Sequence, residues 1–271
     1  MFALLGCAFH SGSVSETEPA PCEVSDDEVH CAFSTVVFHA GLAAREVHFA
    51  LPPGDPPDAG WPVAMVFQGS LYPGVWDGDA DEPFGGLHEA EVVAALLDAG
   101  WAVVAPQAQW DGATWWQTNV SPWSWAWETS ADHRLMVALF DAIEAGELGP
   151  LDPDRMVATG ISSGGYMTSR MAVSYPGRFS ALAIASASFA TCSGPVCVVP
   201  PLPEDHPPTL FMHGEADVIV PIGTMEAYAE GLEEDGVETR VVTEPEAGHE
   251  WLAGAAEEVV GWFGAHSPEA R

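Results

Sequence analysis

A serine flanked by glycines is the first feature of the sequence that could do chemistry. Residues 160–164 are Gly-Ile-Ser-Ser-Gly, which matches the motif G-x-S-x-G with Ser162 at its centre. The apolar pattern predicts a strand over residues 156–160 and a helix over residues 165–174. This succession of strand, tight turn and helix is typical of a nucleophile elbow, which lifts a serine hydroxyl above a sheet. Taken alone, the motif is also compatible with an ordinary turn rich in glycine and serine.

A serine hydroxyl is a weak nucleophile unless a base takes its proton, and the sequence after Ser162 offers a base and an acid. Asp217 follows a strand predicted over residues 209–212, and His249 lies between the last predicted strand and the last predicted helix. The chain order Ser, Asp, His is the one expected for a nucleophile in such an elbow. We therefore predict Ser162 as the nucleophile, His249 as the base and Asp217 as the acid that orients the base. Glu215 is the competing carboxylate, and it lies less deep in the same loop.

The negatively charged oxygen that forms when a hydroxyl adds to a carbonyl needs backbone N–H donors. Ser163 follows the motif serine just before the predicted helix, and helix N-termini favour negative charge. A second donor is expected from the loop after an early strand. The strand predicted over residues 63–67 leads into Gln68-Gly69-Ser70. We predict the N–H groups of Ser70 and Ser163 as the oxyanion hole, with an ordinary strand-to-loop turn as the alternative for Ser70.

Residues 107–127, the tryptophan-rich segment, lie between a predicted strand and a predicted helix. The six tryptophans of the segment are Trp110, Trp115, Trp116, Trp123, Trp125 and Trp127. The segment should overhang the edge of the sheet at which sites of this architecture lie. Its side chains would either form a platform for a polymeric or aromatic ester or pack as a small core of their own. The predicted substrate-binding residues are Tyr72, Trp115, Trp116 and Trp251.

Strands that alternate with helices provide the scaffold for these residues. Strands are predicted over residues 34–39, 45–51, 63–67, 101–105, 156–160, 181–185, 209–212 and 238–243, and helices over residues 87–97, 130–145, 165–174, 225–232 and 250–263. This alternation predicts the α/β class and the α/β-hydrolase fold, a mostly parallel central sheet with helices on both faces. The first two strands are expected to form an antiparallel edge. Residues 34–271 are predicted as one catalytic domain after an N-terminal segment, residues 1–33.

The cysteines indicate the compartment. Cys22 and Cys31 are close in sequence, as are Cys192 and Cys197, which predicts two disulfides and an oxidising environment outside the cytoplasm. The fifth cysteine, Cys7, ends the run Leu-Leu-Gly-Cys and resembles the lipidated cysteine of a bacterial lipoprotein. The residues before it are too few for a signal peptide, so the run is either the remainder of a longer signal or a chance match. We expect the former, and hence a secreted or cell-envelope-anchored protein with a lipid anchor at Cys7.

Composition limits the class of protein. The chain has 271 residues, of which 48% are hydrophobic, enough for one sizeable core. It has 40 acidic and 7 basic residues, none of them Lys, and a formal net charge of −33. Such a charge repels nucleic acids and anionic membrane surfaces. It fits either adaptation to a salty medium or simply a soluble, lysine-poor surface. No His or Cys spacing predicts a metal site, and no cofactor is expected.

The motifs together resemble those of extracellular poly(3-hydroxybutyrate) depolymerases and their esterase and feruloyl-esterase relatives. The residues that carry the resemblance are Asp152-Pro153-Asp154-Arg155, Gly160 to Met167, Tyr175-Pro176, Phe179, His213-Gly214, Asp217, Val220-Pro221, His249, Trp251 and Gly254. The resemblance implies the α/β-hydrolase fold and the triad. Two positions depart from it: Gln68 stands where relatives have His, and Leu252 stands where they have Pro.

The predicted function is that of a serine carboxylic-ester hydrolase that forms an acyl-enzyme and acts on extracellular esters, including polymeric polyesters or aromatic esters. A prolyl-oligopeptidase-like serine peptidase is one alternative, although the chain has no room for the large extra domain usual in that class. A non-catalytic protein that binds polymers through the tryptophan-rich segment is another. The expected partner is an ester substrate, including an insoluble polymer, and the sequence leaves the oligomeric state open.

Overall fold

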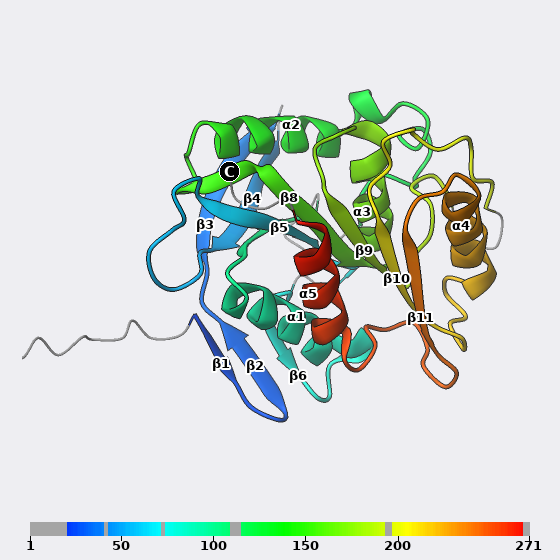
Figure 1. Cartoon of the computed structure of the whole chain (residues 1–271), viewed down its shortest axis with the longest axis horizontal. Helices are drawn as coiled ribbons and strands as arrows, with labels where there is room; N and C mark the ends of the chain where they lie inside the picture. Colours follow the sequence, from blue (N-terminus) through cyan, green and yellow to red (C-terminus); the bar gives the residue numbers. More distant parts are fainter. Residues whose placement is uncertain (1–20, 41–42, 72–73, 109–114, 193–196, 268–271) are drawn as a thin grey trace, which may run out of the picture.

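An eight-stranded sheet forms the centre of the computed structural model, which describes residues 21–40, 43–71, 74–108, 115–192 and 197–267 (Figure 1). Its strands are β3 (Ser34–Ala40), β4 (Ala43–Ala50), β5 (Trp61–Phe67), β7 (Ala102–Pro106), β8 (Leu151–Ile161), β9 (Ala181–Ala185), β10 (Thr209–Gly214) and β11 (Thr239–Glu244). They lie in the order β11-β10-β9-β8-β5-β7-β4-β3. From β11 to β7 every pair is parallel, whereas β4 pairs antiparallel with β7 and β3. The predicted mostly parallel sheet with an antiparallel edge is confirmed.

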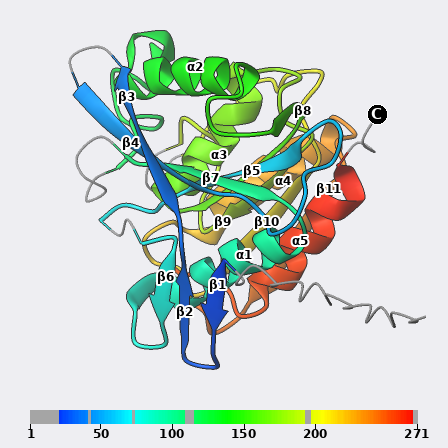
Figure 2. The same cartoon turned by 90° about the vertical axis from the view of Figure 1, so that its left-hand side faces the viewer.

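The side chains of the central strands alternate between two layers of helices, because successive residues of a strand point to opposite faces. In β5, Ala64 and Val66 join the core on one face, and Val63, Met65 and Phe67 join the core on the other. The first face is covered by α1 (Gly86–Asp98) and α5 (Ala255–His266), and the second by α2 (Ala131–Glu144), α3 (Ser163–Ser174) and α4 (Ile222–Glu234) (Figures 1 and 2). Helices therefore cover both faces, as predicted.

Local signals in the sequence place the helix ends. Ser130 caps α2 by accepting a hydrogen bond from the N–H of His133 at 2.9 Å. Gly146, just beyond the end of α2, has a φ of 73°, which glycine adopts without strain. The last helix begins at Ala255 rather than at residue 250, because Gly254 before it has a φ of 81°. The residues before Gly254 are therefore a loop. Among the described residues, no helix has the length and apolar character needed to span a membrane.

A second, three-stranded sheet was not predicted. It consists of β1 (Cys22–Val24), β2 (Glu28–Cys31) and β6 (Asp77–Asp79), all antiparallel, and lies beside α1 (Figure 2). The predicted disulfide between Cys22 and Cys31 is present and joins directly paired residues of β1 and β2. Val29 and Cys31 are buried in the same core as α1. Residues 22–31 of the predicted N-terminal segment thus pack against the domain that follows.

Candidate active site

Ser162 occupies a strained turn between β8 and α3. Its φ of 55° and ψ of −121° lie outside the conformations that non-glycine residues normally adopt. Hydrogen bonds hold the turn on both sides: the N–H of Ser162 donates to the carbonyl of Ala185 on β9, and its own carbonyl accepts from Tyr166, both at 3.0 Å. The local structure is therefore the sharp elbow that the motif predicts.

Glycines allow the elbow to pack against the neighbouring strand β5. A Cβ added to Gly164 would lie 1.9 Å from the carbonyl oxygen of Phe67, and one added to Gly160 would lie 2.4 Å from the same oxygen. Both distances are far shorter than any real contact. The glycines of the motif are thus required by the close approach of α3 and β8 to the end of β5, and this approach brings Ser162 near the loop that contains Ser70.

Asp217 and His249 meet in two loops that follow adjacent strands, β10 and β11. Nδ1 of His249 lies 2.7 Å from Oδ2 of Asp217, which places the donated proton on Nδ1 and leaves Nε2 able to accept one. The loops can approach because Gly214 has no side chain: an added Cβ would lie 2.3 Å from the carbonyl oxygens of Ala247 and Gly248. Asp217, rather than Glu215, is the carboxylate in contact with the imidazole.

The Asp217 carboxylate is buried but fully hydrogen-bonded. Burial alone would raise its pKa, but hydrogen bonds from His213 and His249 and from the backbone of Val220 hold the pKa well below its usual range. Its Oδ1 accepts the N–H groups of Ile219 and Val220, both at 2.8 Å. Nε2 of His213 lies 3.3 Å from Oδ2 and also contacts the carbonyl of Val220 at 2.8 Å. Asp217 is therefore charged and fixed in orientation at neutral pH.

Ser162 and His249 line one cavity of about 230 Å³, the enclosed pocket. Six further residues that line it are Ser70, Leu71, Phe84, Glu89, Ile161 and Ile219. The ring of Phe84 packs edge-on against the imidazole of His249, with ring centroids 5.7 Å apart. The Ser162 hydroxyl and the imidazole share this space but are not hydrogen-bonded to each other in this structure.

Backbone strain concentrates around the enclosed pocket. Among the described non-glycine residues, positive φ values occur at Leu71 (72°), Phe84 (63°), Ser162 (55°) and Ser186 (44°). The first three line the pocket, and the hydroxyl of Ser186 donates to the carbonyl of Glu250 beside His249. Conformations of this kind cost on the order of 1–3 kcal/mol each, and they persist where the surrounding structure enforces them, commonly at functional sites.

The predicted oxyanion donors lie on either side of Ser162. Ser163 is the first residue of α3, and Ser70 follows β5 and lines the enclosed pocket together with Ser162. No backbone carbonyl of a described residue accepts a hydrogen bond from either N–H. Both groups are therefore available to an oxyanion. The Gln68 carbonyl accepts a hydrogen bond from the indole of Trp116 at 3.1 Å, which fixes this loop.

A second cavity, the open groove, is also lined by Ser162. It has a volume of about 440 Å³ and is lined by Ser70, Trp115, Asn119, Tyr166 and Ile219. The predicted substrate contact Trp115 is 48% exposed here. The structure thus brings part of the tryptophan-rich segment to the serine, in a cavity whose lining does not include His249.

The tryptophan-rich segment is neither wholly a platform nor wholly a core. Trp116 and Trp127 are buried, whereas Trp115 is half-exposed and Trp125 is 81% exposed. Trp116 has no exposed surface, so it cannot contact a substrate in this structure as predicted. Its indole instead supports the loop that contains Gln68. Trp251, next to His249, is also buried, and its backbone N–H donates to the carbonyl of Phe84 at 2.9 Å. The predictions for Tyr72, Trp110 and Cys7 fall outside the described residues.

Two buried arginines hold the tryptophan-rich segment by its main chain. Arg45 on β4 donates through Nε and Nη2 to the carbonyl of Gln107. Arg170 on α3 donates to the carbonyl of Thr118 at 2.9 Å and to that of Ser124 at 3.3 Å. A buried guanidinium remains charged at neutral pH and supplies several donors in a fixed plane. The segment is therefore attached to the sheet at one end and to the elbow helix at the other.

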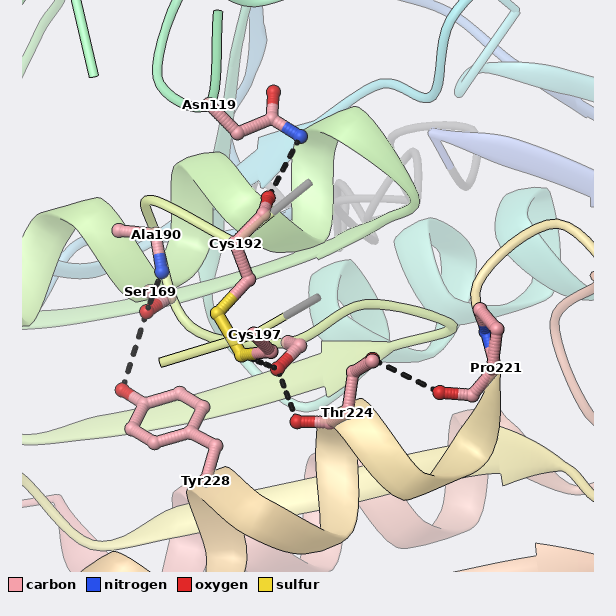
Figure 3. Close-up of a disulfide and its surroundings, with 9 residues drawn as sticks. Asn119, Ser169, Ala190, Cys192, Cys197, Pro221, Thr224 and Tyr228 are labelled. Atoms are coloured by element: carbon pink, nitrogen blue, oxygen red, sulfur yellow. Dashed lines mark hydrogen bonds between the residues drawn. A yellow bond between two sulfur atoms is a disulfide. The ribbon is translucent and has the colours of Figure 1, made fainter. Parts of the chain in front are cut away.

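The predicted disulfide between Cys192 and Cys197 is present and lies near the same segment (Figure 3). The side chain of Asn119 donates to the carbonyl of Cys192 at 3.3 Å. On the other side of the disulfide, the hydroxyl of Ser169 on α3 donates to that of Tyr228 on α4 at 3.2 Å. The region therefore connects the open groove to the two helices α3 and α4.

Phe84 and Glu89 are two of the enclosed-pocket residues that were not predicted from the sequence. Phe84 lies in a short 3₁₀ helix, η1 (Pro83–Gly85), in which no apolar periodicity marks it. Glu89 was seen only as part of a predicted helix. A signal for it exists, because Val93 and Leu96 follow at helical spacing, so Glu89 is an acidic residue on the apolar face of α1.

The elbow at Ser162, together with Asp217 and His249 at the same edge of a parallel sheet, is the arrangement of an α/β hydrolase. Solved structures share the fold. A truncated carbohydrate esterase from gut microbiota has a TM-score of 0.60 at 14% identity, over 88% of this chain and 96% of the other. A putative dienelactone hydrolase from Klebsiella pneumoniae has a TM-score of 0.56 at 18% identity, over 86% and 99%. The predicted α/β-hydrolase fold is confirmed.

A model of the dienelactone hydrolase family matches residues 81–267, and the chain belongs to this family. A poly(3-hydroxyoctanoate) depolymerase from Pseudomonas fluorescens is 48% identical over 242 residues, which cover 88% of this chain and 86% of the relative. The predicted resemblance to depolymerases and esterases and the predicted class, a carboxylic ester hydrolase, are confirmed. The roles of individual residues stay predictions. Among the described residues, no cluster of three or more His, Cys, Asp or Glu side chains could hold a metal ion.

Proposed function

We propose that the chain hydrolyses the ester bonds of water-insoluble aliphatic polyesters of hydroxyalkanoic acids, with Ser162, His249 and Asp217 as its catalytic triad. One observation carries the proposal: a strained serine opens into an apolar pocket that it shares with an imidazole held by a buried carboxylate. The 48% identical relative is named for a polymer of this class. The apolar lining of the pocket suits aliphatic side chains.

In this mechanism the hydroxyl of Ser162 attacks the ester carbonyl while Nε2 of His249 takes its proton. The N–H groups of Ser70 and Ser163 donate to the oxygen that becomes negative. His249 then gives the proton to the departing alkoxide, and an acyl-enzyme remains. Water adds to the acyl-enzyme with His249 as base, and the acid product leaves. Asp217 keeps the imidazole in one tautomer and stabilises its charged form.

The charge of the chain favours this substrate over anionic ones. A polyester carries no charge along its length, so a protein with a net charge of −33 does not repel it. Each hydrolysis creates a carboxylate, which the same charge does repel. The protein therefore tolerates the neutral polymer and favours departure of the anionic product.

The place of action in this proposal is outside the cytoplasm. The two disulfides support it, because structural disulfides form and persist mainly in oxidising compartments. A lipid anchor at Cys7 remains part of the prediction.

Clearing of a poly(3-hydroxyoctanoate) latex, followed by turbidity and by release of hydroxy acid, tests the proposal. Ser162→Ala should abolish clearing and labelling by a fluorophosphonate. Ser174→Ala, the same substitution at the other end of α3, is the matched control and should retain both. If Ser162→Ala clears the latex at the wild-type rate, the proposed nucleophile is wrong. If the wild type cleaves only small soluble esters, or cleaves peptide anilides instead, the proposed substrate class is wrong.

A further inference from the structure

A buried carboxyl group lines the enclosed pocket and has no part in the mechanism above. Glu89 lies in the first turn of α1, is 5% exposed, and shares the pocket lining with Ser162 and His249. Its Oε1 has no hydrogen-bond partner among the residues that the structure describes. The indole N–H of Trp251 is near the carboxyl but does not make a hydrogen bond of normal geometry with it. The group is thus polar and buried, and one of its two oxygens lacks a partner among the described residues.

The surroundings of Glu89 favour its neutral form. Burial is the main cause and raises its pKa to about 8; the nearby Trp251 indole opposes this, and the charge of Glu82 adds to it. Among the described residues that line the pocket, Glu82 is the other carboxyl and His249 the only group that can become a cation. At neutral pH the carboxyl of Glu89 is therefore protonated and is a hydrogen-bond donor.

An unsatisfied buried polar group is costly unless something bound supplies its partner. Leaving such a group unpaired destabilises the folded protein, and an apolar residue at this helix position would avoid that cost. The enclosed pocket provides space next to the carboxyl, and its remaining wall is mainly apolar, with Leu71, Phe84, Ile161 and Ile219. An acceptor oxygen on an otherwise apolar molecule fits both the carboxyl and the apolar wall.

We infer that Glu89 is a specificity-determining residue that donates a hydrogen bond to an ester carbonyl neighbouring the one under attack. The inference rests on the proposed function and deepens it, because a polyester repeats its ester groups along the chain and a simple alkyl ester does not. Glu89 would therefore select the interior of a polyester chain over an isolated ester. An ionised carboxylate offers no proton to the carbonyl oxygen and repels it.

The test compares two neutral substrates in the same detergent micelles. One is a trimer of 3-hydroxyoctanoic acid with its hydroxyl acetylated and its carboxyl methylated; the other is octyl octanoate, which has one ester and no neighbouring carbonyl. The readout is the ratio of their kcat/KM values, with products separated by chromatography. The variants are Glu89→Leu, which removes the donor at similar volume, and Glu89→Gln, which keeps an N–H donor. Glu91→Leu, on the same helix but outside the pocket lining, is the matched control.

We expect Glu89→Leu to lower the trimer-to-octanoate ratio about tenfold, the usual effect of losing one hydrogen bond in a closed site. Glu89→Gln and Glu91→Leu should keep the ratio within about twofold of the wild type. Between pH 6 and 9 the wild-type ratio should fall as Glu89 ionises, and that of Glu89→Gln should stay level. A merely structural role for Glu89 would not produce this difference between the two pH profiles.

Equal ratios in the wild type and Glu89→Leu would overturn the inference, as would a wild type that does not prefer the trimer. If Glu89→Leu fails to fold, the pH profiles of the wild type and Glu89→Gln decide, and identical profiles overturn the inference. Failure of the proposed function has a different signature. In that case Ser162→Ala retains activity or the wild type cleaves neither substrate.

Discussion

The two cavities beside Ser162 differ in almost every physical respect. The enclosed pocket is small, mostly apolar, strained at Leu71 and Phe84, and contains one unsatisfied carboxyl at Glu89. The open groove is larger and is lined by the half-exposed Trp115 and by polar groups such as Asn119. The first is bounded by turns of strained geometry, and the second by a segment held through arginines and a disulfide-linked loop.

This difference suits a division of tasks around the proposed nucleophile, Ser162. A closed apolar pocket discriminates among neighbouring chemical groups, because desolvation makes each unpaired polar atom costly. An open groove with an exposed aromatic offers contact area with little selectivity. Substitutions in the shared machinery should therefore affect all substrates alike, whereas substitutions in one cavity should change the ratio between substrates.

The largest effect is expected from Asp217→Asn. This substitution removes the charge that orients His249, the proposed base for substrates bound in either cavity. Loss of the acid in such a triad lowers kcat by about 10⁴-fold, because the imidazole loses its tautomer and its counter-charge. Rates on a soluble nitrophenyl ester and on polymer latex should fall together. Glu215→Gln, which changes the other carboxylate of the loop, is the control. A loss confined to one substrate would contradict a shared catalytic centre.

The enclosed pocket should make stability depend on pH through Glu89. Its pKa is raised to about 8 in the folded state, so between pH 4.5 and 8 folding binds a proton that the unfolded chain has lost. Stability contributed by the neutral form is present at low pH and is lost as pH rises through that window, by roughly 3–5 kcal/mol. Urea unfolding of the wild type and Glu89→Gln at several pH values measures this. Parallel pH dependence in the two proteins would show that Glu89 does not titrate as described.

The open groove should weaken when the second disulfide is removed. The double substitution Cys192→Ala, Cys197→Ala should lower the free energy of unfolding by about 2 kcal/mol, because a short covalent loop no longer restricts the unfolded chain. The contact of Asn119 with residue 192 loosens with it, so activity on latex should fall more than activity on a soluble ester. Calorimetry and the two rates test this. An equal loss of activity on both substrates would show that the disulfide does not act through the open groove.

The smallest effects are expected from one aromatic in each cavity. Phe84→Ala should lower kcat/KM about fivefold on both soluble ester and latex, because apolar contact inside the pocket is lost. Trp115→Ala should lower activity on latex about threefold more than on the soluble ester, since only a surface contact is lost. Paired assays of both variants check this. If Trp115→Ala changes both rates equally, the groove does not distinguish a polymer surface from a small molecule.

The elbow and the order of the triad candidates could be predicted because the sequence encodes them locally. Gly160 and Gly164 must be glycines for β8 and α3 to approach Phe67, and this requirement is written into the motif itself. Strands such as β5 could be predicted because burial on both faces demands an unbroken apolar run. Each of these features leaves a pattern within a few consecutive residues, so it can be recognised without knowing which distant strand lies against it.

The enclosed pocket could not be predicted because it depends on distant parts of the chain meeting. Phe84 reaches His249 only because the N–H of Trp251 bonds to the carbonyl of Phe84 and Gly85 leaves room for the Trp251 backbone. Trp115 is half-exposed and Trp116 is buried although the two residues are adjacent. An irregular segment has no repeating apolar pattern that would show which of its side chains are buried. The hairpin β1–β2 was missed because its strands, of three and four residues, are too short to show a clear pattern.

The arginine contacts to the tryptophan-rich segment have a consequence for how the molecule can change. Arg45 and Arg170 bond to main-chain carbonyls, which every residue possesses, so these contacts do not depend on the exposed side chains that the segment carries. Its exposed positions, Trp115 and Trp125, are thus open to mutation without loss of the frame. Substitutions at these exposed positions can therefore change which surfaces the segment binds, while its backbone contacts and the neighbouring elbow stay as they are.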